Sequence, residues 1–265
     1  MVTADATKPR MLRRAEVRRI QRKARERFRR AHRAEQSFSR QLRQVARQVG
    51  AIIKGFAPRG VVQNTTPMVE ALRRYADMLR PWAEAVSGRL IAEVGKRDEH
   101  AWNELGREIG RALGVEIRGA ATGEQMRKKM LEQVALITSL PLDAAKHVHE
   151  WTIRSLEGGA RAKEAAAEIL KTGKVTTARA MLIARTETTR TATAMTEARA
   201  RYIGSEGYIW RTAGDGAVRE THRKLNGRFF KWDDPPVAGE SGERSHPGAI
   251  YNCRCYAEPV IPEQL

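Results

Sequence analysis

The sequence predicts an α+β fold that is predominantly α, with its strands gathered near the C-terminal end. Three observations lead to this prediction. Apolar residues recur every three or four positions through 17–49, helix start and stop signals divide 66–204, and aromatic and β-branched residues beside turn signals concentrate in 208–258. We therefore expect a long basic N-terminal helix, a helical middle region, and C-terminal helices followed by a small β-sheet.

Residues 1–49 are expected to form a basic amphipathic helical arm. Its apolar stripe occupies one helical face and consists of Val17, Ile20, Ala24, Phe28, Ala31, Ala34, Phe38, Leu42, Val45 and Val49. A continuous helix of this length would extend roughly 50 Å at 1.5 Å per residue. Such a rod is expected to project from its domain and not to fold back on it.

Most of the positive charge lies on this arm. The 265-residue chain has a formal net charge of +18, and residues 10–47 hold 15 Lys/Arg against 3 Glu. Arginines near phosphates release counterions without reading sequence, so the arm suits non-specific binding to double-stranded DNA. The candidate contact residues are Arg13, Arg14, Arg18, Arg19, Arg22, Lys23, Arg25, Arg29, Arg30 and Arg33.

Other interpretations of the arm remain open. The apolar stripe could dock on partner helices while the arginines meet acidic protein or DNA, and we favour docking and DNA binding together. A basic amphipathic helix also suits membrane surfaces or calmodulin-like grooves. An ordinary packed helix with a solvated charged face ranks last, because so much like charge repels itself.

Glycines and a proline interrupt the helical pattern after the arm, and we place a hinge at 50–66. Thr66 and Pro67 are typical of a helix start, and Pro81 is expected to break or kink that helix after Leu79. A second helix should continue to about residue 113, so that 67–113 forms the helical middle region. A linker at 114–123 then precedes a C-terminal domain at 124–265.

The C-terminal domain is expected to begin with helices at 124–138, 141–156 and 160–170, divided by Pro141 and by the glycines at 158–159. Thr176 should cap a longer helix that ends near residue 204. In that helix Arg185 and Glu187 lie about 200° apart and cannot pair with each other. Each is expected to anchor the strands through a separate polar contact.

Short extended segments should follow. Residues 208–211 and 228–232 are predicted strands, separated by a helix at 217–225 and by the tight turn Asn226-Gly227. A third extended segment contains Cys253 and Cys255, whose thiols fall on one face by alternation.

Two thiols on one face can reach one zinc ion, and one or two imidazoles would complete a tetrahedron. The candidate ligands are His222, His246, Cys253 and Cys255. The alternative is a pair of reduced, half-buried thiols, which suits a reducing cytoplasm. A disulfide between two cysteines that are separated by a single residue would close a strained ring. The zinc-protease motif H-E-x-x-H and the zinc-deaminase motifs do not occur.

The ordered motifs of the last third resemble a known family. They are IARTETTRTATA (183–194), W-x-T-A-x-D (210–215), V-R-x-x-H-x-x-L-x-G (218–227) and P-G followed by N-C-R-C (247–255). Together they resemble the phage Mu F-like minor head proteins, also called phage head morphogenesis proteins, over about 120–260. The residues that the resemblance singles out are Arg185, Glu187, Asp215, Arg219, His222, Gly227, Asn252, Cys253 and Cys255.

The resemblance implies a minor capsid component of a tailed phage or prophage, found in the virion and, during assembly, in the host cytoplasm. Its expected partners are the portal protein, the major capsid protein, or both. Arg185, Glu187, Asp215, Arg219 and Asn252 would then serve as structural polar contacts, with no catalytic residue, no small-molecule substrate and no membrane span. A second hypothesis is a metal-dependent nuclease that uses Asp215, His222 and His246, with the arm binding DNA. Hard cations normally need several converging carboxylates, which argues against it.

Overall fold

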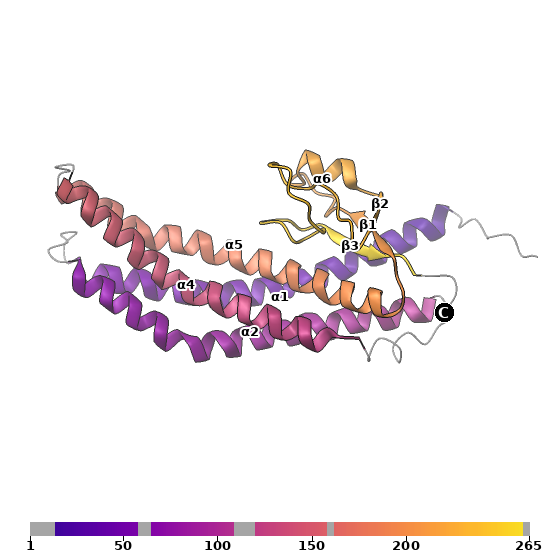
Figure 1. Ribbon diagram of the computed structural model, residues 1–265, viewed down its shortest axis with the longest axis horizontal. Coiled ribbons are helices and arrows are strands. Elements are labelled where there is room, and N and C mark those ends of the chain that lie inside the picture. The colour runs from indigo at the N-terminus through magenta and orange to yellow at the C-terminus, as the bar shows by residue number, and fades with distance from the viewer. Residues whose placement is uncertain (1–13, 58–64, 109–119, 158–161, 262–265) are drawn as a thin grey trace, which may run out of the picture.

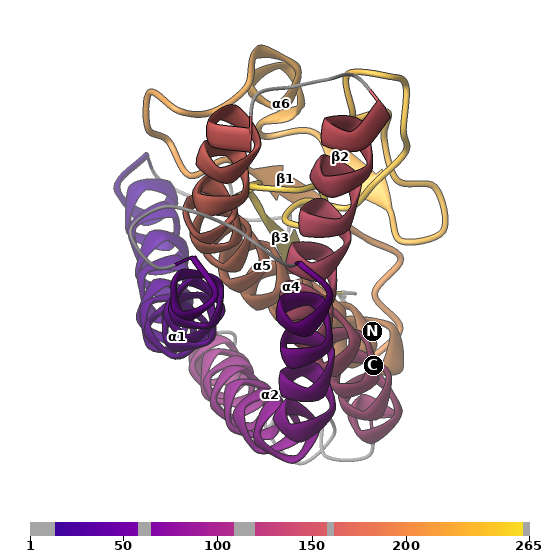
Figure 2. The same ribbon diagram turned by 90° about the vertical axis from the view of Figure 1, so that its left-hand side faces the viewer.

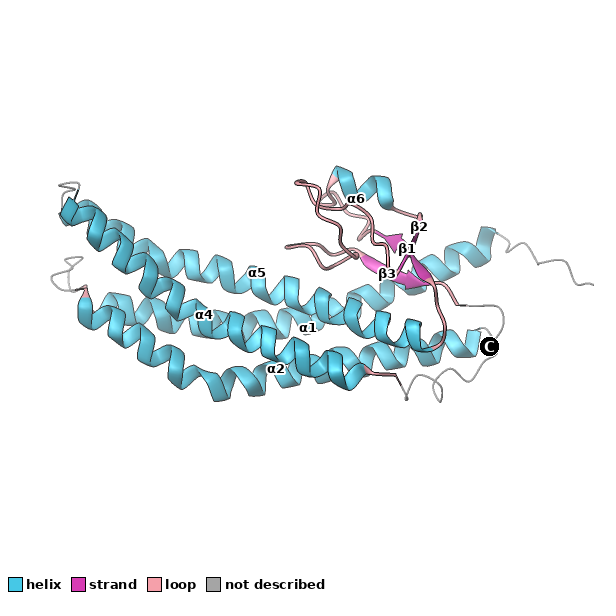
Figure 3. Ribbon diagram, viewed as in Figure 1, coloured by secondary structure: helices cyan, strands magenta, loops and turns pink. Residues whose placement is uncertain are grey.

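The computed structural model describes residues 14–57, 65–108, 120–157 and 162–261. Four long helices run side by side along its longest axis, each antiparallel to the one before it (Figures 1 and 2). They are α1 (Arg14–Gly55), α2 (Thr66–Glu108), α4 (Thr122–Glu157) and α5 (Ala162–Tyr202). The remaining elements form a small module that lies against α5 (Figure 3).

Side chains from all four helices share one hydrophobic core. Leu42 of α1, Ile137 of α4 and Ile183 of α5 are buried in this cluster, and α2 contributes Val86 and Leu90. A second cluster, which includes Ile53, Leu72 and Ile169, holds the opposite end of the bundle, where α1 passes to α2. Burying each such side chain contributes about 1.5–3 kcal/mol, so these helices are stabilised mainly by packing on one another.

The expectation that the N-terminal helix projects from the fold is wrong for its second half. Ala34, Phe38 and Leu42 are at most 2% exposed, and α1 packs along α5 and α2. The arginines of this half, Arg33, Arg40, Arg43 and Arg47, face solvent. A packed helix with a solvated charged face, the interpretation ranked last, therefore describes the part of α1 whose side chains are described, from residue 32 onward.

Three predicted helix boundaries are also wrong. Pro81 lies inside α2 and Pro141 lies inside α4, and neither proline ends its helix. The segment 160–170 and the helix predicted from Thr176 are parts of one helix, α5. Thr176 is not a cap, because its hydroxyl donates to the carbonyl oxygen of Thr172, one turn earlier.

The hinge predicted at 50–66 begins inside α1, which continues to Gly55. Residues 58–64 of this hinge, most of the linker at 114–123 and the predicted helix end near 113 lie outside the described residues. The division of the chain into domains stays a prediction.

The sheet has three antiparallel strands in the order β2-β1-β3, namely β2 (Phe229–Lys231), β1 (Gly207–Arg211) and β3 (Tyr256–Pro259). A short helix, α6 (Glu220–Leu225), lies between β1 and β2 along the chain. The strands predicted at 208–211 and 228–232 are confirmed. The third strand was placed too early, because Cys253 and Cys255 precede β3 instead of lying within it.

A separate core joins the sheet to the helices. Tyr208, Trp210 and Trp232 of the sheet module are at most 2% exposed and pack in one cluster with Ile203, which directly follows α5, and Trp102 of α2. The sheet is therefore fixed to the end of α5. Within the described part of the chain, no helix is both long and apolar enough to span a membrane.

Candidate metal centre

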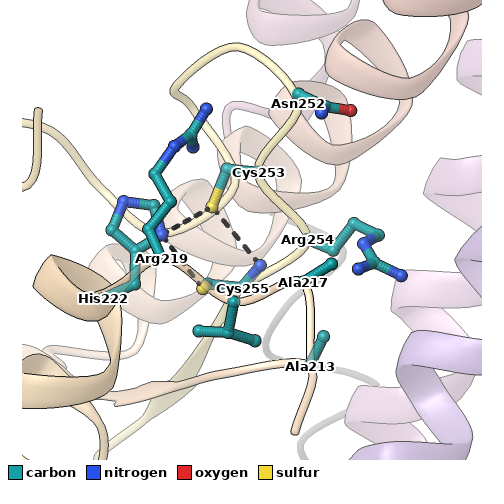
Figure 4. A pocket seen from close by; sticks show the side chains of 9 residues that line it. Ala213, Ala217, Arg219, His222, Asn252, Cys253, Arg254 and Cys255 are labelled. Carbon is teal, nitrogen blue, oxygen red and sulfur yellow. Dashed lines mark hydrogen bonds between the residues drawn. The ribbon is translucent and has the colours of Figure 1, made fainter. Parts of the chain in front are cut away.

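Three of the predicted metal ligands meet in the sheet module (Figure 4). The Nδ1 atom of His222 lies 3.5 Å from the Sγ atom of Cys253 and 3.5 Å from that of Cys255. All three side chains are buried, and their ligand atoms lie within 4.8 Å of one another. Among the described residues, no other group of three or more His, Cys, Asp or Glu side chains is arranged in this way.

The local fold explains why these side chains converge. His222 is carried by α6, and its ring packs edge-on against Trp210 of β1, with 5.3 Å between the ring centroids. Just before β3, Cys253 and Cys255 are both buried, whereas Arg254 between them is partly exposed, so the two thiols face inward and Arg254 faces away from them. Arg254 forms an ion pair with Asp215 at 2.7 Å, which holds this alternation in place.

The electrostatics favour a negative charge on one of the two sulfurs. Hydrogen bonds from the Cys255 thiol and from His222, together with the backbone N–H of Cys255, lower the pKa of Cys253 to about 4 against the cost of burial. The pKa of Cys255 is raised, because its thiol donates to Cys253 and is itself buried. The two pKa shifts have opposite directions, so the arrangement favours a negative charge on Cys253 over one on Cys255.

A pocket of about 110 Å³ opens beside the cluster, and its lining includes Ala213, Ala217 and Val218 as well as the three candidate ligands. Arg219 also lines the pocket, and Figure 4 shows its side chain alongside His222 and Cys253. Its guanidinium donates to the carbonyl oxygen of Tyr251 at 3.1 Å. The cluster is thus buried among protein atoms on most sides and bordered by a polar opening on one side.

His246 is not part of this cluster. Its Nδ1 atom lies 3.1 Å from the hydroxyl of Tyr208, and its ring packs against Trp232. Its Nε2 atom faces Glu197 of α5 at 3.9 Å. The sequence placed His246 among the ligands because it lies close to the cysteines along the chain, whereas the structure uses it to hold the sheet to α5.

The segment 247–255, which we call the strap, runs back along α5 before it reaches β3. Side chains of α5 bind its backbone carbonyls one after another. Thr193 donates to Pro247 at 2.7 Å, Thr189 to Gly248 at 2.9 Å, and Arg190 to Ala249 at 2.7 Å. The strap therefore docks on α5 mainly through its main chain.

Polar contacts continue where the strap leaves the helix. Arg185 donates to both Glu35 of α1 and the side-chain oxygen of Asn252, and the backbone N–H of Asn252 donates to Thr186. Glu187 faces another way and pairs with Arg190 at 3.1 Å. Arg185 and Glu187 thus have separate partners, as their spacing on the helix requires. The expectation that Glu187 anchors the strands is wrong, because its partner Arg190 lies on the same helix.

Sequence reasoning missed four residues that hold the strap, namely Thr186, Thr189, Arg190 and Thr193. A usable signal was present, because these positions recur at helical spacing and form one polar stripe on α5. Of the ten basic residues predicted to bind nucleic acid or a partner, Arg33 is exposed. Arg13 and the side chains of the other eight lie outside the described residues.

Comparison with known proteins finds a family that is similar to the last part of the described chain. Residues 146–258 match the family described as Phage Mu protein F like protein. The match runs from within α4 through α5, the sheet, α6 and the strap, and it confirms the resemblance for this part of the chain. Residues 146–258 are therefore similar to the Mu F-like family.

A relative from Haemophilus influenzae, described as an uncharacterized protein, is 29% identical over 182 residues. These residues make up 68% of this chain and 39% of the relative, so the matched region spans about two-fifths of that protein's length. No solved structure matches the chain.

Proposed function

We propose that the protein is a head morphogenesis protein of a tailed bacteriophage or prophage. It would be a minor component of the virion, located at the portal vertex or on the inner capsid surface, and would support head assembly, DNA packaging or genome delivery. The observation that carries this proposal is the Mu F-like match, which covers α5, the strap and the sheet up to residue 258.

The contacts of the polar residues support a structural role. Arg185 binds Glu35 and Asn252, Asp215 binds Arg254, and Arg219 binds the backbone of the strap. These side chains join parts of the fold that are distant in sequence. When charged side chains make contacts within the fold, they hold its parts in fixed positions. A fold held in this way is suited to present a rigid surface to partners.

The nuclease alternative receives little support from the geometry. Both carboxylate oxygens of Asp215 contact Arg254, and two of the carboxylates nearby in sequence are also paired with arginines, Asp233 with Arg201 and Asp234 with Arg244. The cluster at His222 offers one nitrogen and two sulfurs, which favour softer metals than the Mg²⁺ of most nucleases.

The basic face of α1 supports contact with DNA or with an acidic partner surface. Arg33, Arg40, Arg43 and Arg47 are exposed on the described half of the helix, while its apolar stripe is buried in the bundle. In this half, therefore, the charged face and not the apolar one is exposed and available for contact with a partner. The partners we propose are double-stranded DNA, bound without sequence preference, and the portal or major capsid protein.

The location of the protein in purified particles tests the proposal. Heads from an induced lysate would be separated on a density gradient, and the protein quantified in each fraction by mass spectrometry. We expect a few copies per head, missing from particles assembled without the portal if the contact is at that vertex. Absence from every head fraction would overturn the proposal.

A cleavage assay separates the structural role from the enzymatic one. The purified protein would be incubated with plasmid DNA and Mg²⁺, Mn²⁺ or Zn²⁺. We expect no cleavage above that of a mock purification. Cleavage that disappears in both Asp215→Asn and His222→Asn would establish the nuclease instead.

A further inference from the structure

The buried cluster of His222, Cys253 and Cys255 has the dimensions of a metal site. A tetrahedral Zn²⁺ with Zn–S bonds of about 2.3 Å and a Zn–N bond of about 2.0 Å separates each sulfur from the nitrogen by about 3.5 Å. The two Nδ1–Sγ distances are both 3.5 Å. An ion could therefore enter with little movement of the three side chains.

The surroundings of His222 fix the ring nitrogen that faces the sulfurs. Its Nε2 atom lies 3.2 Å from the carbonyl oxygen of Ala238, an atom that can only accept a hydrogen bond. When a metal ion takes the place of the hydrogen bond between Nδ1 and Cys253, the remaining imidazole proton is held on Nε2, and Nδ1 presents its lone pair to the ion. A backbone carbonyl that orients a histidine through its other nitrogen is a common arrangement around bound metals.

The surroundings of Cys253 also favour its role as a metal ligand. The backbone N–H groups of Gly248 and Cys255 both point at its sulfur, each with 3.4 Å between nitrogen and sulfur. Such donors stabilise a thiolate, the form of cysteine that binds metals. Gly248 has a φ of 81°, and a Cβ atom there would lie 2.9 Å from the carbonyl oxygen of Cys255. The close approach of the strap therefore depends on glycine at this position.

We propose that His222, Cys253 and Cys255 bind one Zn²⁺ ion through Nδ1 and the two Sγ atoms, with a fourth, exchangeable ligand supplied from the neighbouring pocket. Nitrogen and thiolate donors favour zinc over Mg²⁺ or Ca²⁺. The pocket beside Arg219 supplies room for a water molecule or a small anion in the fourth position. The ion would join α6 to the strap. This inference stands apart from the proposed function, because it rests on the cluster alone.

Metal analysis of the full chain, purified without chelators, tests the proposal directly. We expect about one zinc per chain by mass spectrometry. Removal by a chelator should lower the melting temperature, and Zn²⁺ should restore it whereas Mg²⁺ should not. The chain contains two cysteines, so a thiol reagent should modify two thiols in the apoprotein and should react far more slowly in the zinc form.

Variants locate the site. His222→Asn and the double variant Cys253→Ser/Cys255→Ser should lose the zinc, while His246→Asn should keep it, because His246 lies outside the cluster. Co²⁺ bound to the unmodified chain should give thiolate-to-metal charge-transfer absorption, a readout that does not require the variants to fold. Zinc far below one per chain, a disulfide between the cysteines, or zinc retained by the double variant would each overturn the proposal.

Discussion

Arg185 of α5 donates a hydrogen bond to the side-chain oxygen of Asn252, a residue whose backbone φ is 61°. This is the one positive φ outside glycine among the residues that the structure describes. The conformation turns the N–H of Asn252 toward Thr186, and Cys253 follows immediately. Arg185 and Asn252 thus hold the point at which the strap turns from α5 toward the candidate metal centre.

Two substitutions of Asn252 should differ in stability, because its backbone lies in the left-handed region. Asn252→Ala removes the hydrogen bond with Arg185 and places a methyl-bearing residue in the left-handed region, so we expect it to lower the free energy of unfolding by about 2 kcal/mol. Asn252→Gly removes the same hydrogen bond but tolerates the conformation and should cost about 1 kcal/mol less. Urea denaturation measures both. Equal destabilisation by the two variants would show that the backbone conformation contributes nothing.

Gly248 offers a test of the close approach between the strap and α5. In Gly248→Ala the new Cβ atom would lie 2.9 Å from the carbonyl oxygen of Cys255 and 3.1 Å from the hydroxyl of Thr193, at a φ of 81°. We expect a decrease of about 2 kcal/mol or more in the free energy of unfolding. Gly216→Ala is the matched control, because no atom lies within 4 Å of its added Cβ, and it should change stability by less than about 0.5 kcal/mol.

The second half of α1 should behave as core. Leu42 is fully buried among the long helices, so Leu42→Ala should destabilise the protein by about 2–5 kcal/mol in thermal or urea unfolding. Arg47→Ala, further along on the exposed face, should stay within about 0.5 kcal/mol of the wild type. Similar small effects for both variants would mean that α1 is not part of the bundle.

His246 should make stability depend on pH. Burial and Arg201 lower its pKa below the ordinary value of 6.5, despite the opposing effect of Glu197. The unfolded chain therefore binds more protons than the folded chain as the pH falls from about 6.5 toward the lowered pKa, and stability should decrease over this interval. Replacing the imidazole in His246→Gln should flatten this part of the curve. Unfolding free energies measured from about pH 8 to about pH 5 give the comparison, and identical slopes would contradict it.

The salt dependence of DNA affinity should show which basic residues contact DNA. Deleting residues 1–30 removes twelve Lys/Arg and three Asp/Glu and leaves the buried part of α1 intact. If these residues contact DNA, the slope of log affinity against log salt should become shallower by about 0.9 for each phosphate that is no longer neutralised. Deleting residues 1–9 removes one lysine and one aspartate and should leave the slope unchanged. An unaltered slope in the longer deletion would assign DNA binding to another surface.

The sequence predicted the elements of this fold better than their ends. Pro81 and Pro141 are strong local signals for a helix break, yet both lie within helices whose neighbouring turns are buried, including Leu79 and Leu140. Packing of a long apolar face outweighs the hydrogen bond that proline removes. The same balance placed the described part of the apolar stripe of α1, from Ala34 onward, inside the bundle, although the charge of the helix predicted exposure.

The candidate site was predictable where it depends on local geometry. Alternation placed Cys253 and Cys255 on one side even though β3 begins only after them, and His222, also a predicted ligand, lies with them in the structure. His246 could not be assigned from spacing, because its position depends on Tyr208 and Glu197, which are distant in sequence. No local rule could identify Arg185 and Asn252 as partners across 67 positions of chain.

The length of α5 has a mechanical consequence. At 1.5 Å per residue its 41 residues form a rod of about 60 Å that begins among the side chains at the far tip of the bundle and ends beneath the sheet. A load applied at that tip would be transmitted along a single continuous helix to the strap. Whatever anchors one end of the molecule therefore also sets the direction in which the opposite end faces.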